Sequence, residues 1–146
     1  MNDVLELEKR LHFEMFSNHD AWVIGNKILS IVEKNKLKPV RIRIVYEGDI
    51  VFQYIMPGKK GVEWLDRKQN TVERYKHSSY YVFLDQQENH LYDEEDTHLA
   101  ICGGGFPLVV NDKLCGCIIV SGLRHDEDHQ LIIDALEDYF DESSCE

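Results

Sequence analysis

Hydrophobic side chains recur at helical spacing in the first part of the chain. Val4, Leu7, Leu11 and Met15 predict a helix over residues 4–16. The cap-type residues 17–20 then precede a second helical pattern, which ends near residues 36–39. This second pattern places five apolar residues on one side: Ala21, Ile24, Ile28, Ile31 and Val32.

Two stretches alternate between apolar and polar residues, which is typical of β-hairpins. Residues 40–46 alternate around Arg41 and Arg43, residues 47–49 form a turn, and the alternation continues over residues 50–56. A second pair of strands is expected at residues 106–110 and 114–120, with residues 111–113 as their tight connection.

The remaining patterns are helical. One long helix is predicted over residues 62–87, and a last helix begins near Asp126 with a core stripe from Leu131 to Tyr139. The order helix, helix, hairpin, helix, hairpin, helix predicts an α+β fold with one antiparallel sheet covered by helices. Without internal repeats or a linker-like segment, residues 1–146 are expected to form a single domain.

Charge and cysteine usage narrow the class of protein. The net charge of −11 disfavours nucleic acids and anionic membranes as partners, although cations gathered at residues 34–43 and 59–74 allow a locally basic pocket. Without a signal-peptide pattern or an apolar run of ~20 residues, we expect a cytoplasmic protein. Cys102, Cys115, Cys117 and Cys145 lack C-x-x-C spacing, so reduced thiols are favoured over a metal or redox pair.

The predicted long helix carries the best candidate site. At about 100° per residue, Arg67, Asn70, Arg74, His77 and Tyr81 fall within roughly 80° of one another. Guanidinium, amide, imidazole and phenol groups in a row suit a small anion or the propionates of a tetrapyrrole. The alternative is a solvated helix face or a face buried against another subunit.

Other motifs give weaker signals. The glycines at residues 103–105 precede a strand, so they fit a close backbone approach or a ligand rim better than a phosphate loop. His125 and His129 are four residues apart and are weak candidates for metal ligands, because no third ligand is evident. Ser78, Ser79 and Ser121 lack a nucleophile-elbow pattern, so no catalytic residue is assigned.

Several segments, taken together and in this order, resemble a known family: residues 16–22, 64–72, 77–80, 103–107, 120–123 and 128–129. They resemble uncharacterised protein family 0303, a branch of the GlcG/HbpS-like, or "heme-degrading domain", superfamily. The resemblance implies a profilin-like α/β/α fold with a five-stranded antiparallel sheet, whose fifth strand would lie around residues 98–102, and assembly into homo-oligomers. Relatives in the superfamily bind heme or accompany corrinoid enzymes. The resemblance assigns no axial heme ligand among His12, His19, His77 and Met56.

The leading hypothesis is an oligomeric binding module for a tetrapyrrole (heme or corrinoid) or a small organic anion, and it is favoured over an enzyme. Its expected pocket combines the helical stripe with residues near the glycine run: Arg67, Asn70, Arg74, His77, Ser78, Tyr81, Gly104, Phe106 and Ser121. One alternative is a heme-modifying or heme-degrading enzyme with His77 or His129 at the iron. Another is a protein–protein interaction module, which exposed Trp22 or Trp64 would favour.

Overall fold

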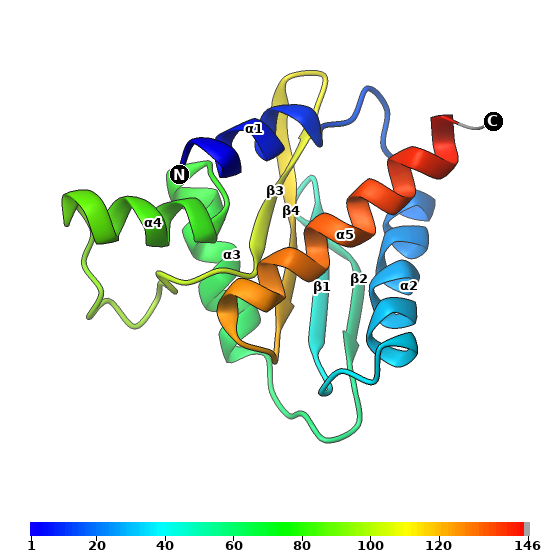
Figure 1. Ribbon diagram of the computed structural model, residues 1–146, viewed down its shortest axis with the longest axis horizontal. Coiled ribbons are helices and arrows are strands. Elements are labelled where there is room, and N and C mark those ends of the chain that lie inside the picture. Colours follow the sequence, from blue (N-terminus) through cyan, green and yellow to red (C-terminus); the bar gives the residue numbers. More distant parts are fainter. Residues whose placement is uncertain (145–146) are drawn as a thin grey trace.

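The computed structural model describes residues 1–144, so Cys145 and Glu146 lie outside it. The chain begins with two helices and a hairpin, continues with two further helices and a second hairpin, and ends in a helix (Figure 1). The elements are α1 (Asn2–Arg10), α2 (Asn18–Lys34), β1 (Arg41–Tyr46), β2 (Asp49–Ile55), α3 (Glu63–Tyr75), α4 (Ser79–Asn89), β3 (Gly105–Val110), β4 (Lys113–Ser121) and α5 (His125–Ser144).

The four strands form one antiparallel sheet in the order β2-β1-β4-β3. Both predicted hairpins are confirmed, and the two hairpins join where β1 pairs with β4, with Arg41 opposite Ser121. The expected fifth strand at residues 98–102 is wrong, because this segment is irregular in the described chain. Its polar groups instead meet α3, where the Thr71 hydroxyl donates to the Ala100 carbonyl (3.0 Å) and accepts from the Ala100 N–H (2.9 Å).

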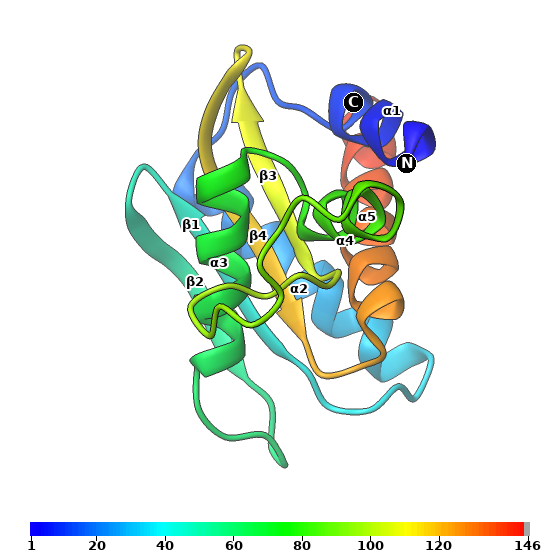
Figure 2. The same cartoon turned by 90° about the vertical axis from the view of Figure 1, so that its left-hand side faces the viewer.

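Helices cover both faces of the sheet, which confirms the predicted α+β class (Figure 2). On one face, α2 and α5 pack over Ile42, Ile44 and Ile118 in the larger apolar core. On the other face, α3 places Leu65 and Val72 against Val45, Cys117 and Ile119. The alternation of residues 40–46 therefore separates two buried faces rather than a buried face and a solvated one.

Arg43 shows how the second face tolerates a buried cation. The residue is 4% exposed, and its guanidinium donates to Gln53 Oε1 (2.6 Å), Asp66 Oδ1 (2.6 Å) and Gln69 Oε1 (2.9 Å). Asp66 and Gln69 belong to α3, so Arg43 fixes this helix on the sheet. Its charge is compensated by a carboxylate and two amide oxygens, as a buried cation requires.

The first helix is shorter than predicted, because it ends at Arg10 rather than continuing to residue 16. The chain leaves the helix so that the backbone of Phe13 can bond to the end of β3: its N–H donates to the Val109 carbonyl (2.8 Å) and its carbonyl accepts from Asn111 N–H (2.9 Å). Met15, one of the four residues on which the longer helix was predicted, lies beyond the end of α1 and is 83% exposed. By contrast, α2 begins at the predicted cap, where the Ser17 N–H donates to Asp20 Oδ2 (2.8 Å).

The predicted helix over residues 62–87 is wrong as one element, because it is divided into α3 and α4. Lys76 adopts a left-handed conformation (φ 60°) that ends α3, and Ser78 caps α4 by accepting a hydrogen bond from the Tyr81 N–H (3.1 Å). Helical phase therefore does not continue across residues 76–78. Among residues 1–144, no helix combines the length and apolar character that crossing a membrane requires.

Candidate functional site

A cavity of about 270 Å³ lies at the end of the sheet where β1 begins and β4 ends. Three cationic side chains line it, those of Arg41, Lys59 and Lys68, together with the carboxylate of Asp128. The remaining lining comes from Trp64, Cys102, Ser121, Gly122, Leu123 and His125. The cavity is thus built by α3 and the loop before it, the ends of two strands, Cys102, the turn after β4 and the start of α5.

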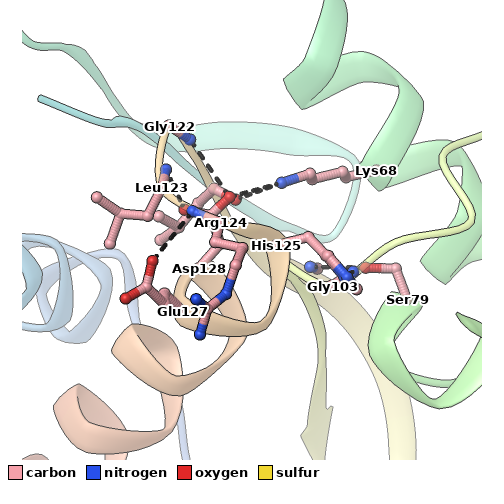
Figure 3. Close-up of polar contacts among 11 residues, drawn as sticks. Lys68, Ser79, Gly103, Gly122, Leu123, Arg124, His125, Glu127 and Asp128 are labelled. Atoms are coloured by element: carbon pink, nitrogen blue, oxygen red, sulfur yellow. Dashed lines mark hydrogen bonds and ion pairs between the residues drawn. The ribbon is translucent and has the colours of Figure 1, made fainter. Parts of the chain in front are cut away.

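A buried ion pair between Lys68 and Asp128 forms the inner wall (Figure 3). Lys68 Nζ donates to Asp128 Oδ2 (3.1 Å) and to the Val120 carbonyl (2.9 Å), and the two side chains are 3% and 2% exposed. Asp128 also accepts from the backbone N–H groups of Gly122 (3.3 Å) and Leu123 (2.8 Å). The pair therefore joins α3, the end of β4 and the first turn of α5 through charge-assisted hydrogen bonds.

Gly104 makes room for this ion pair. Its φ of +122° is a conformation that L side chains rarely adopt, and a Cβ there would collide with Lys68 Nζ and the Val120 carbonyl oxygen. Because a residue with any side chain would displace the ammonium group, glycine at this position is explained by the position of Lys68. The predicted close backbone approach at residues 103–105 is thereby confirmed.

Burial governs the acid–base properties of the cavity. Desolvation raises the pKa of Asp128, against the opposing influence of Lys68 and of the backbone N–H groups. Desolvation also raises the pKa of the Cys102 thiol, which Lys68 lowers only in part. Cys102 therefore remains a thiol at neutral pH and lacks the thiolate character of a catalytic cysteine.

His125 is oriented by the glycine run. Its Nδ1 accepts a hydrogen bond from the Gly103 N–H (2.9 Å), as Figure 3 shows. Because the accepting nitrogen carries no proton, the neutral ring carries its proton on Nε2, which is then a hydrogen-bond donor. The ring also packs against Phe83, with centroids 4.5 Å apart.

His129 lies outside the cavity. It is 4% exposed, stacks near Tyr80 with ring centroids 4.7 Å apart, and its Nδ1 has no hydrogen-bond partner among the described residues. Burial lowers its pKa to about 4, so the ring is neutral at pH 7. Within residues 1–144, histidine, cysteine, aspartate and glutamate side chains form no group of three or more suited to a metal ion.

Comparisons with known proteins place the chain in a family. The profile of the family described as "Haem degrading protein HbpS-like" matches residues 16–137. The chain belongs to the HbpS-like family. A UPF0303 protein of Psychromonas ingrahamii is 35% identical over an alignment that covers 94% of this chain and 91% of the relative.

Solved structures agree with this assignment. The crystal structure of the Ybr137w protein superimposes with a TM-score of 0.85 at 28% identity, covering 97% of this chain and 88% of that protein. The PduOC:heme complex has the same fold, with a TM-score of 0.70 at 22% identity over 84% of this chain and 93% of its own. The HbpS-like fold is therefore established for this chain.

Within this HbpS-like fold, three polar side chains of the predicted helical stripe contact the loop that follows α4. Arg67 Nε donates to the Leu99 carbonyl (2.9 Å), and the Asn70 amide donates to the His98 carbonyl (2.9 Å). Arg74 lies 3.8 Å from Asp96. These three α3 residues hold residues 96–99 against the helix, and none of them lines the cavity.

The other stripe residues lie at the junction of α1 and α4. His77 Nδ1 is 3.0 Å from Glu8 Oε1, and the His77 ring packs on Tyr81 with centroids 4.4 Å apart. Ser78 is buried as the cap of α4. The structure therefore divides the nine predicted pocket residues between different places: Ser121 lines the cavity, Gly104 lies beside Lys68, and Phe106 is fully buried in the larger core.

Sequence reasoning did not identify the central residues of the cavity. Lys68 had a recognisable signal, because its spacing from Leu65 and Val72 places an ammonium group on the apolar face of α3. Asp128 had no comparable signal in the sequence. Its ion-pair partner is 60 residues away along the chain, so no local pattern could have joined the two.

Proposed function

We propose that this HbpS-like chain is a binding module for a small organic anion, held in the cavity beside Lys68 and Asp128. A volume of about 270 Å³ lies near the lower end of ligand pockets, which span roughly 300–1,000 Å³. This size suits a small carboxylic acid better than a tetrapyrrole. Two cations in excess over the single carboxylate make the cavity locally basic on a chain of net charge −11.

The donors around the cavity support an anionic ligand. Lys68 uses two of its three ammonium N–H groups within the protein, which leaves one for a ligand. Arg41 donates from Nε and Nη2 to the Lys60 carbonyl (3.2 and 2.8 Å), and its Nη1 remains available to a ligand. Lys59 has no side-chain hydrogen bond or ion pair within residues 1–144, so its charge is uncompensated. The single observation that carries the proposal is the buried Lys68–Asp128 ion pair in the wall of a cavity that Arg41 and Lys59 also line.

Binding is favoured over catalysis by the same residues. The Cys102 thiol is protonated at neutral pH because burial raises its pKa. Ser121 has no hydrogen bond to a histidine among the described residues, so no base is positioned to activate its hydroxyl.

Fluorescence of Trp64 offers a direct test. The chain has two tryptophans, so a Trp22→Phe background makes Trp64, at the cavity wall, the single reporter. Propionate and benzoate should change its emission saturably, whereas propionamide and benzamide should not. If neither carboxylate binds, the proposal is wrong.

A charge-matched pair of variants locates the ligand. Arg41→Gln/Lys59→Gln should weaken carboxylate binding about tenfold or more, since each lost contact is a hydrogen bond between charged groups. Lys76→Gln/Lys113→Gln removes the same charge from exposed positions outside the cavity and should leave binding unchanged. Equal effects of the two double variants would assign binding to net charge rather than to the cavity.

Heme is a second candidate ligand, favoured by His77. His77 borders a different hollow of about 360 Å³, together with His12, and its Nδ1 contacts the half-buried Glu8 carboxylate at 3.0 Å. A histidine whose Nδ1 is held by a carboxylate presents Nε2 in a fixed orientation, as metal-ligating histidines do. The family description and the PduOC:heme complex add support by analogy.

A hemin titration separates the two ligands. A saturable Soret shift that His77→Ala abolishes and His90→Ala retains would support heme at this hollow. Addition of a reductant then distinguishes a heme-binding module from a heme-degrading enzyme, because only the enzyme would consume the Soret band with formation of product. Absence of a saturable shift would exclude the heme alternative.

We also propose that the 146 residues act as one domain that assembles into a homo-oligomer. Exposed apolar residues on α2 and β2 support an interface: Trp22 is 59%, Ile50 52% and Tyr54 43% exposed. Light scattering on the purified protein tests this point. A wild-type monomer, or an oligomer that persists in Trp22→Ser/Ile50→Asp, would contradict an interface at this surface.

A further inference from the structure

A second hollow adjoins the cavity across the turn between β4 and α5. Its volume is about 530 Å³, and it shares Gly122 and Leu123 with the cavity. Its outer wall is the connection between α2 and β1, which contributes Lys36, Leu37 and Lys38. The two hollows are therefore neighbours on one end of the molecule, separated by two residues of a single turn.

The charges of this second hollow are available to a ligand. Neither Lys36 nor Lys38 has an ion-pair partner within residues 1–144, and both are exposed. Arg124 is already occupied, since its guanidinium donates to both carboxylate oxygens of Asp126 (2.6 and 2.9 Å). The Glu127 carboxylate accepts from the Arg124 backbone N–H (3.3 Å). Because a backbone N–H does not neutralise a carboxylate, Lys36 and Lys38 face the single negative charge of Glu127, and this hollow has a net excess of one positive charge.

We propose that the ligand is a small dicarboxylate with one carboxylate in each hollow. This inference rests on the proposed anion-binding function of the cavity. One carboxylate meets Arg41 and Lys59, the other meets Lys36 and Lys38, and the aliphatic spacer crosses the Leu123 side chain, which lines both hollows. A monocarboxylate can occupy only one of the two sets of cations at a time.

A series of dicarboxylates tests the proposal on the full chain. Succinate, glutarate, adipate and pimelate are compared by calorimetry with the monocarboxylates of equal length: butyrate, valerate, hexanoate and heptanoate. At least one dicarboxylate should bind about tenfold more tightly than its matched monocarboxylate, because its second carboxylate binds intramolecularly once the first is held. Equal affinity throughout the series would overturn the inference while leaving the proposed function intact.

Variants assign the preference to the second hollow. Lys36→Gln/Lys38→Gln should reduce dicarboxylate affinity about tenfold and leave monocarboxylate affinity unchanged, and Lys76→Gln/Lys113→Gln should change neither. If Lys36→Gln/Lys38→Gln weakened both classes equally, the two lysines would act only through the general field, and the inference would be wrong. Binding of neither class to the wild type would instead remove the proposed function itself.

Discussion

His129 should make the stability of this protein depend on pH. The ring is 4% exposed, its Nδ1 has no hydrogen-bond partner among the described residues, and Phe106 and Tyr80 pack nearby. Protonation would place a positive charge in these surroundings without compensation. Burial accordingly lowers the pKa of His129 from 6.5 to about 4 in the folded state.

The sign follows from proton linkage. Between pH 6.5 and about 4, the unfolded chain binds a proton at His129 that the folded chain does not, so the free energy of unfolding falls as the pH falls. The contribution of the neutral His129 ring to the free energy of unfolding is fully present above pH 6.5. At about 1.4 kcal/mol for each pH unit, the gap in pKa corresponds to about 3 kcal/mol, most of which is lost by pH 4.5. That loss is a large fraction of the stability of an ordinary domain.

Urea denaturation at pH 7.5 and pH 4.5 measures this loss in the wild type and in His129→Leu. Leucine does not titrate, so the variant should lose about 2–3 kcal/mol less than the wild type over this interval. The raised pKa values of Glu8 and Asp128 act in the opposite direction, but they are common to both proteins and cancel in the difference. His19→Leu, at an exposed histidine, is the matched control and should behave like the wild type. An equal loss in wild type and His129→Leu would refute a buried neutral imidazole.

Three further substitutions, two beside the cavity and one at the cap of α4, are tested by urea denaturation. Lys68→Met should cost about 3–5 kcal/mol by leaving Asp128 charged and buried, and Lys68→Met/Asp128→Leu should recover most of that loss; additive losses would contradict a coupled pair. Gly104→Ala should cost at least about 2 kcal/mol through its positive φ and the collision with Lys68, and a neutral result would disprove the close approach. Ser78→Ala should cost about 1 kcal/mol by removing the cap of α4, whereas an unchanged midpoint would show that the cap contributes nothing.

Local patterns predicted the elements that depend on local physics. The hairpins followed from a period of two, and the start of α2 followed from Ser17 and Asp20, because strand alternation and helix capping are properties of neighbouring residues. The sequence did not reveal the break between α3 and α4, because the apolar residues before and after residues 76–78 fit one uninterrupted helical spacing. Lys76 ends α3 in the left-handed conformation, but a lysine at this position does not predict the end of a helix as a glycine would.

The predicted site failed for a related reason. The polar residues Arg67 and Asn70 share a helix face, but their partners are backbone carbonyls of residues 98–99, about 30 residues further along the chain. A polar stripe shows which side chains need partners and does not show whether a ligand or a loop supplies them. A lysine within an apolar stripe is more informative, because burying its charge requires a specific partner, as Lys68 finds in Asp128.

An acidic chain can bind an anion only if its charges are distributed unevenly, and the ion pairs show such a distribution. Cations that face α5 are neutralised by its acidic side chains, as in the contacts of Lys27 with Asp138 (3.1 Å) and Glu142 (2.6 Å). At the cavity, Asp128 is paired with Lys68, so Arg41 and Lys59 are left without an ion-pair partner among residues 1–144. The N-terminus of α5 lies at the same end and adds a positive partial charge. The buried pair therefore contributes no net charge of its own, and it leaves the two outer cations to attract the ligand.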